Sequence, residues 1–257
     1  MYWGNVMTAV PDCDIVSDAE LAAAAAAGER DAFARIYHRY ADRLHDYCLG
    51  LVRDHHAAAD CVHDVFCEAA RCLTDLREPA KLRPWLYTMA RHQALRHIRN
   101  RRREEARDAL PDVISPSTGA SSIVRRNELA QLVDDAARGL SERDRIVLEL
   151  AYRHGLDGAE LAEALGVSDV SAKKLVQRLR DRVERSLSAL LVSRYAARNG
   201  CRELAASLSG GDGQFSVLMR KRIMRHIESC PSCDVDRRNL VGSVAVLAGI
   251  FLEKLSQ

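Results

Sequence analysis

The stretch DGAELAEALGVSDVSAKKLVQRLRDRVER, residues 157–185, decides the fold that this chain is expected to adopt. Its first part repeats apolar residues at helical spacing, and Gly166 and Val167 interrupt the repeat. Ser168 then stands where a helix N-cap is expected, because its hydroxyl can accept a hydrogen bond from a free amide of the first turn. A second helical pattern follows, so the stretch predicts a helix-turn-helix unit.

The second helix of this unit carries polar and basic side chains away from its apolar stripe. Such side chains suit base edges and phosphates in a major groove of DNA. The candidate contact residues are Ser171, Lys173, Lys174, Gln177 and Arg178. An ordinary helical hairpin with a solvated charged face is the alternative interpretation.

The composition favours helices throughout the chain. Aromatic residues make up only 5% of the 257 residues, Ala and Leu are abundant, and alternating strand-like runs are hard to find. We therefore expect an all-α fold with two helical domains, a flexible linker between them and a small helical domain after them. The expected parts are a loose tail at 1–16, a first domain at 17–103, a linker at 104–122, a second domain at 123–190 and a small domain at 195–257.

The charges are distributed unevenly along the chain. Between Asp12 and Glu78 there are 14 acidic residues against 7 Lys and Arg, whereas between Lys81 and Arg107 there are 9 Lys and Arg against 2 acidic residues. An acidic surface beside a basic one indicates two different partners, one of them a polyanion. Two complementary faces of a single fold are the alternative.

Three carboxylates follow at four-residue steps in the helix expected at 55–73, namely Asp60, Asp64 and Glu68. This spacing places them on one ridge of the helix. No nucleophile or metal-binding group accompanies them, so we interpret the acidic ridge as a docking surface for a protein partner. A merely solvated face is the alternative.

A basic helix follows, with aromatic residues at its start. Bases of single-stranded DNA can stack on such rings while arginines follow the backbone. The candidate residues are Trp85, Tyr87, Arg91, His92, Arg96, Arg99 and Asn100. The alternative is that both aromatic residues are plain core residues.

Near the C-terminus, the spacing of Cys201, His226, Cys230 and Cys233 is that of a metal site. Three thiolates and one imidazole form a closed tetrahedral set that suits structural Zn²⁺. A dithiol that cycles to a disulfide, or one without function, is the alternative. Oxidation of zinc thiolates releases the metal, so redox control of this domain is a further hypothesis.

Other classes of function are not supported by the sequence. It shows no Gly-rich phosphate loop, no nucleophile elbow and no open catalytic metal set, so we do not expect an enzyme. No signal peptide is visible, and the longest apolar run, 240–252, holds about 13 residues where a membrane span needs about 20. We therefore expect a cytoplasmic protein that is not inserted in a membrane and whose cysteines are thiols or metal ligands.

The acidic ridge, the run PWLYTMARHQALRHIRNRRR (84–103) and the run LSERDRIVLELAYRHGLDGAELAEALGVSDVSAKKLVQRLRDRV (140–183) together resemble the extracytoplasmic-function (ECF) group of the sigma-70 family of RNA polymerase sigma factors. The resemblance covers about residues 17–190. It implies that the acidic ridge binds RNA polymerase core, that the basic helix binds and melts the −10 element of promoter DNA, and that the helix-turn-helix binds the −35 element.

Two motifs depart from the pattern of this family. His92 and Gln93 stand where the −10 helix usually carries an Asn, and the run from Val170 to Lys173 replaces a usual Thr-Val-Lys. The sequence preference at the promoter is therefore not fixed by the resemblance.

The spacing Cys-x24-His-x3-Cys-x2-Cys resembles the zinc-binding anti-sigma domain, which normally belongs to a separate inhibitor. The chain is then a sigma factor with a fused regulatory domain. One alternative is a helix-turn-helix repressor or activator that binds duplex DNA without polymerase, and another is a zinc-dependent interaction protein. Whether the domain inhibits or is required, and whether a separate anti-sigma partner exists, stays open.

Overall fold

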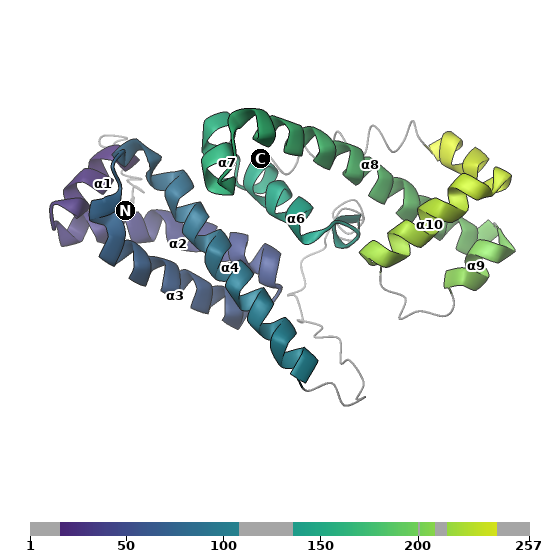
Figure 1. Ribbon diagram of the computed structural model, residues 1–257, viewed down its shortest axis with the longest axis horizontal. Coiled ribbons are helices and arrows are strands. Elements are labelled where there is room, and N and C mark those ends of the chain that lie inside the picture. Colours follow the sequence, from purple (N-terminus) through teal and green to yellow (C-terminus); the bar gives the residue numbers. More distant parts are fainter. Residues whose placement is uncertain (1–15, 108–135, 200, 209–214, 241–257) are drawn as a thin grey trace, which may run out of the picture.

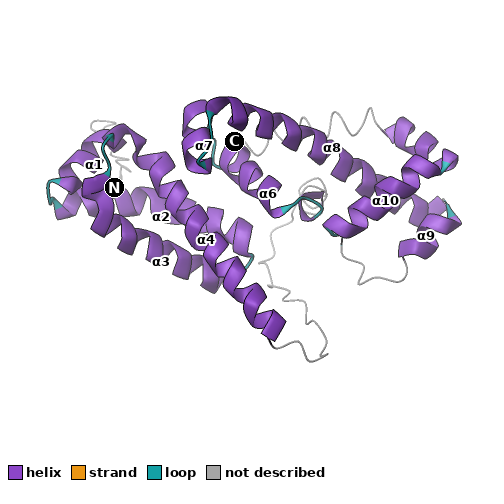
Figure 2. Cartoon of the chain, in the orientation of Figure 1, coloured by secondary structure: helices purple, strands orange, loops and turns teal. Residues whose placement is uncertain are grey.

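A computed structural model describes residues 16–107, 136–199, 201–208 and 215–240. All regular elements of these residues are helical, which confirms the expected all-α class (Figure 2). The elements are α1 (Asp18–Ala26), α2 (Arg30–Val52), α3 (His55–Cys72), the 3-10 turns η1 (Leu73–Asp75) and η2 (Pro79–Lys81), α4 (Leu82–Arg107), α6 (Glu142–Leu148), the π-helical turn η3 (Glu149–Arg153), α7 (Gly158–Leu165), α8 (Asp169–Asn199), α9 (Arg202–Leu208) and α10 (Val217–Ser229), followed by a helical segment at 231–240. Residues 1–15 of the expected N-terminal tail (1–16) and residues 108–122 of the expected linker (104–122) lie outside the described residues. Among the described helices, none is long and apolar enough to span a membrane.

Local signals in the sequence explain where the first helices begin and end. The Ser17 hydroxyl accepts a hydrogen bond from the amide of Glu20, whose carboxylate accepts one from the amide of Ser17. Arg53 adopts a left-handed conformation that ends α2, and the carboxylate of Asp54 then accepts a hydrogen bond from Ala57 at the start of α3. These caps set the short turn between α2 and α3.

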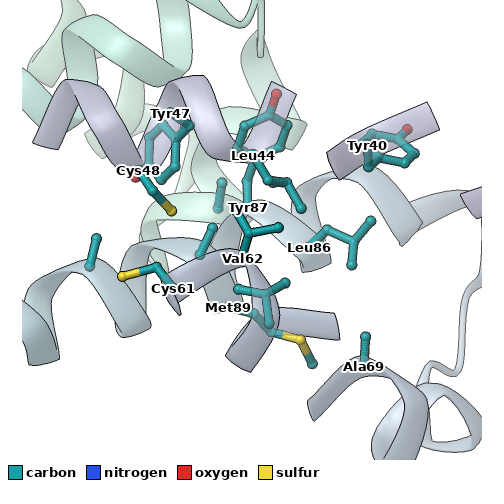
Figure 3. Close-up of a cluster of buried hydrophobic side chains, with 14 of the residues drawn as sticks. Tyr40, Leu44, Tyr47, Cys48, Cys61, Val62, Ala69, Leu86, Tyr87 and Met89 are labelled. Carbon is teal, nitrogen blue, oxygen red and sulfur yellow. The ribbon is translucent and has the colours of Figure 1, made fainter. Parts of the chain in front are cut away.

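Helices α1 to α4 form the N-terminal bundle around one apolar core. Figure 3 shows how α2, α3 and α4 each supply side chains to it, among them Leu44, Val62 and Leu86. Leu44 and Leu86 are fully buried. Burying a side chain of this size contributes about 1.5–3 kcal/mol, so the repeat of apolar residues in α2 and α4 accounts for the packing of this bundle.

Helices α6, α7 and α8 form the C-terminal bundle, which contains the helix-turn-helix. Gly166 takes a left-handed conformation at the end of α7, which glycine adopts without strain. The Ser168 hydroxyl accepts a hydrogen bond from the amide of Ser171, which confirms Ser168 as the N-cap of α8. The predicted unit of two helices and a short turn is therefore present.

The two bundles pack against each other, with α7 on α4 and with α6 and η3 on α2 (Figure 1). Ile146, Leu150 and Leu161 of the C-terminal bundle belong to the same apolar cluster as the core of the N-terminal bundle. Ion pairs lie at the edges of this contact: the Arg102 guanidinium is 2.7 Å from the Glu142 carboxylate. In this arrangement the two bundles are closed upon each other.

The described residues of the tail, 195–199, 201–208 and 215–240, continue the C-terminal bundle. Helix α8 runs without a break from Asp169 to Asn199, so the expected boundary between 190 and 195 falls inside a helix. Helices α9 and α10 pack on the second half of α8 (Figure 1). Their Leu204 and Ile223 belong to the same apolar cluster as Leu187 of α8.

Candidate nucleic-acid and metal-binding sites

The first half of α8 presents its polar side chains to solvent. All five candidate −35 contact residues are exposed, namely Ser171, Lys173, Lys174, Gln177 and Arg178. Leu179 and Val183 point the other way and are buried against the rest of the bundle. The helix therefore offers a free polar and basic surface of the kind that enters a major groove.

The acidic ridge of α3 lies beside the basic helix α4. The Asp64 carboxylate accepts a hydrogen bond from Arg96 at 2.7 Å, and the Glu68 carboxylate accepts one from Gln93 at 2.9 Å. Asp60 is exposed. Because Asp64 and Arg96 are both about half exposed, their ion pair contributes at most about 1 kcal/mol, and either group can exchange it for an external partner.

The candidate −10 residues of α4 divide into two groups. Four of them are exposed, namely His92, Arg96, Arg99 and Asn100. Trp85 and Arg91 are half-buried, and Trp85 packs against the apolar core. Tyr87 is 1% exposed, so its ring is covered and cannot stack on DNA bases in this arrangement. For Tyr87 the structure favours the core role that the sequence left as an alternative.

A polar cluster lies where the two bundles meet, and no pattern in the sequence indicates it. The Tyr87 hydroxyl is 3.0 Å from Nδ1 of His154, and the rings of Tyr47 and Tyr87 both pack against that imidazole. Arg83 donates hydrogen bonds to the His154 carbonyl and, at 3.0 Å, to the Glu160 carboxylate. Arg83 and His154 are therefore contact residues between the bundles that were not among the predicted sites.

Close backbone approach also marks this contact. A Cβ atom on Gly50 of α2 would lie 2.7 Å from the carboxyl carbon of Glu149, so no larger residue fits there without a shift. Glu149 is 4% exposed and begins the π-helical turn η3. π-Helical turns are rare and often occur at functional positions.

Acid is expected to loosen the contact between the bundles. Burial, and then the nearby Arg153, Arg83 and Arg43, lower the pKa of His154 from 6.5 to about 4. Between these two pH values the open state binds more protons than the closed one, so the closed state loses stability as the pH falls. Protonation of His154 lowers the stability of the closed state by at most about 3 kcal/mol.

Small-angle scattering between pH 7 and pH 4 measures the opening as an increase in the radius of gyration. A His154→Gln variant keeps a side chain that can hydrogen-bond to the hydroxyl of Tyr87 but does not take up the proton. We expect it to expand less on acidification than the wild-type protein. Equal expansion of both proteins would show that other groups control the opening.

The four predicted metal ligands come together in the tail. Cys201 follows α8, His226 lies in α10, Cys230 ends α10, and Cys233 begins the next helical segment and is fully buried. Their ligand atoms all lie within 4.8 Å of one another. Sγ of Cys201 is 3.4 Å from Nε2 of His226 and 4.0 Å from Sγ of Cys230.

The distances from Sγ of Cys201 are close to those between ligand atoms of a tetrahedral zinc site. With Zn–S bonds of about 2.3 Å and Zn–N bonds of about 2.0 Å, neighbouring ligand atoms of a tetrahedron lie about 3.5–3.8 Å apart. The residues form a possible metal-binding cluster, the only one found among the described residues. Sequence spacing was sufficient to identify all four.

Comparison with known proteins agrees with the geometry of the two bundles. The family model for Sigma-70 region 2 matches residues 36–104, and the model for Sigma-70, region 4 matches residues 130–183. The region 4 match ends before the four Cys and His residues. It contains the helix-turn-helix and all five candidate −35 residues.

Relatives of known name are sigma factors. The probable RNA polymerase sigma factor RfaY of Xanthomonas campestris pv. campestris is 31% identical over 63% of this chain, and this match spans 42% of that protein. RNA polymerase sigma factor SigZ of Bacillus subtilis is 26% identical over 71% of this chain and 96% of its own length. ECF RNA polymerase sigma factor SigK of Mycobacterium ulcerans is 29% identical over 61% of this chain and 84% of its own.

A solved structure, that of CnrH in complex with the cytosolic domain of CnrY, is also similar. It superposes with a TM-score of 0.50 and 26% identity over 68% of this chain and 96% of that one. Region 2 and region 4 thus follow each other here on two helical bundles. This chain belongs to the ECF group of the sigma-70 family of RNA polymerase sigma factors.

Proposed function

We propose that this chain joins RNA polymerase core in the cytoplasm and directs it to promoters through three surfaces. The acidic ridge of α3 binds core, the exposed residues of α4 bind the opened −10 element, and the first half of α8 binds the −35 element. The observation that carries the proposal is the exposure of all five polar residues of α8 within the matched region 4. A repressor that acts without polymerase would not need the region 2 match beside it.

The closed arrangement bears on this mechanism. Contacts with α7 and with His154 cover part of α4, including the ring of Tyr87 and the guanidinium of Arg91, whose Nε is buried. Binding of α4 to opened DNA therefore requires the bundles to separate at least in part. Among the described residues, the buried Nε atoms of Arg83 and Arg91 and the buried Nε2 of His154 lack hydrogen-bond partners, so the contact is less stable than a well-satisfied interface.

We further propose that Cys201, His226, Cys230 and Cys233 hold a structural zinc ion. Bound zinc would supply cross-links between the end of α8, α10 and the segment at 231–240, and four protein ligands leave no open position for catalysis. The distances between the ligand atoms support this assignment. Redox control through oxidation of these thiolates stays a prediction, which release of metal by hydrogen peroxide would test.

Run-off transcription with bacterial core polymerase tests the sigma function, on a promoter selected from genomic fragments. Gln177→Ala is expected to lower specific transcripts by about 5- to 150-fold, because an amide that pairs with a base contributes about 1–3 kcal/mol of discrimination. Glu184→Ala, at an exposed position further along α8, is the matched control and is expected to keep activity. If the wild-type chain gives no transcript that depends on core, the sigma proposal is wrong and the independent repressor is favoured.

A further inference from the structure

Basic side chains continue along α8 beyond the predicted −35 residues. Lys174, Arg178 and Arg185 are all exposed. Arg178 follows Lys174 by four residues and Arg185 follows it by eleven. All three therefore lie on one face of the helix, since eleven residues make about three turns. The row therefore points the same way as the recognition surface and extends about 10 Å past Arg178, with one exposed acid, Asp181, on the same face.

Helix α10 of the tail lies beside the end of this row. Arg220 of α10 interacts electrostatically with Arg182 and Arg185 of α8 and with Asp144 of α6. Because Asp144 also forms an ion pair with Arg182, its single negative charge is shared between Arg182 and Arg220. Figure 1 shows α10 lying against α8 in this part of the molecule. The fold thus adds positive charge to the row rather than neutralising it.

The exposed face of α10 is itself basic. The helix has four basic residues against one acidic residue. Lys221 and Arg225 are exposed and, being four residues apart, share one face. Within the described residues neither of them forms an ion pair. The one acidic residue of α10, Glu228, is also exposed and lies three residues beyond Arg225. Two basic side chains on one exposed face of a helix that packs on α8 fit the phosphates of a nucleic acid.

We propose that α10 extends the DNA-contacting surface of region 4, with Lys221 and Arg225 binding backbone phosphates of duplex DNA beside the bases that α8 contacts. The inference rests on the proposed −35 function of α8. In this proposal the tail strengthens promoter binding instead of inhibiting it. Phosphate contacts of this kind add affinity and fix the position on the duplex but carry no sequence preference.

The test measures binding of the full chain, with its metal, to a fluorescent mixed-sequence DNA duplex at several salt concentrations. Each lost phosphate contact reduces the slope of log affinity against log salt by about 0.9. Lys221→Gln with Arg225→Gln is therefore expected to reduce the slope by about 1.8 and to weaken binding at every salt concentration. Circular dichroism and metal content show whether the variant keeps its fold.

Two further variants separate the possible failures. Arg35→Gln with Arg77→Gln removes two exposed charges from the N-terminal bundle and is expected to leave the slope unchanged. Lys174→Gln with Arg178→Gln tests α8 itself. If only the α8 variant weakens binding, the role of α10 is wrong while the −35 function stands. If neither weakens binding, the proposed function fails as well, and tighter binding by the α10 variant would show that the tail obstructs DNA.

Discussion

A chain that ends after Arg194 is expected to lose the stable fold of region 4, even though the region 4 family model ends at residue 183. Between residues 186 and 192, α8 is buried on nearly all sides: Leu187, Leu190 and Val192 are each at most 5% exposed. A helix that is apolar all round needs partners on all sides. The tail helices α9 and α10 supply a large part of that cover through residues such as Leu204 and Ile223.

Exposing these side chains costs about 1.5–3 kcal/mol each, and a domain is stable by only about 5–15 kcal/mol. We therefore expect the truncated chain to aggregate, or to melt at least about 10 °C below the full chain in thermal unfolding, since about 1 kcal/mol shifts the midpoint by several degrees in a domain of this size. A chain that ends after Leu240 keeps the described tail helices and serves as the control.

A point substitution tests the same contact without deleting the tail. Phe215 precedes α10 and is buried; a Cβ on Gly139 would lie 2.5 Å from its ring and also 2.5 Å from the Ser186 hydroxyl. Phe215→Ala is expected to destabilise region 4 by about 3–5 kcal/mol. If the chain cut at Arg194 melts like the full chain and gives more transcript than the full chain, the tail is a separate inhibitory unit, as in the anti-sigma resemblance.

The features that the sequence predicted correctly are local ones. The helix-turn-helix depends on an apolar repeat, a glycine and the cap of Ser168, all within 29 residues of chain. The spacing of Cys230 and Cys233 brings both thiols to one turn, and His226 is one helical turn earlier. Each of these signals is encoded in neighbouring residues, so no knowledge of distant contacts was needed.

The features that it could not predict depend on distant contacts. Arg83 and Glu160 are 77 residues apart in sequence, and Tyr87 and His154 are 67 apart. An arginine or a tyrosine on a basic helix has the same local pattern whether it faces DNA or another bundle. The burial of Tyr87 therefore follows from the packing of α7 and of His154 against α4, which periodicity does not reveal.

Removing one ligand of the metal cluster is expected to release the metal and unfold the end of the tail. Cys233→Ser is the sharpest variant, because its sulfur is fully buried and a serine hydroxyl is a poor ligand for zinc. Binding of zinc to sites of this type contributes about 10–16 kcal/mol in isolated zinc-finger peptides. The apolar contacts of the short helices α9 and α10 contribute too little free energy to compensate for losing it. We expect bound zinc, measured by plasma emission spectroscopy, to fall from about one ion per chain to near zero.

Cys67→Ser is the matched control, since Cys67 is an exposed cysteine of α3 outside the cluster. It is expected to keep both the metal and the melting temperature. The same zinc content in both variants would contradict the metal site. Loss of zinc from Cys233→Ser without any fall in melting temperature would show that the ion binds the tail but does not stabilise its fold. Because α8 carries the recognition residues at one end and meets Cys201 at the other, loss of metal that does unfold the tail should also weaken binding to the −35 element.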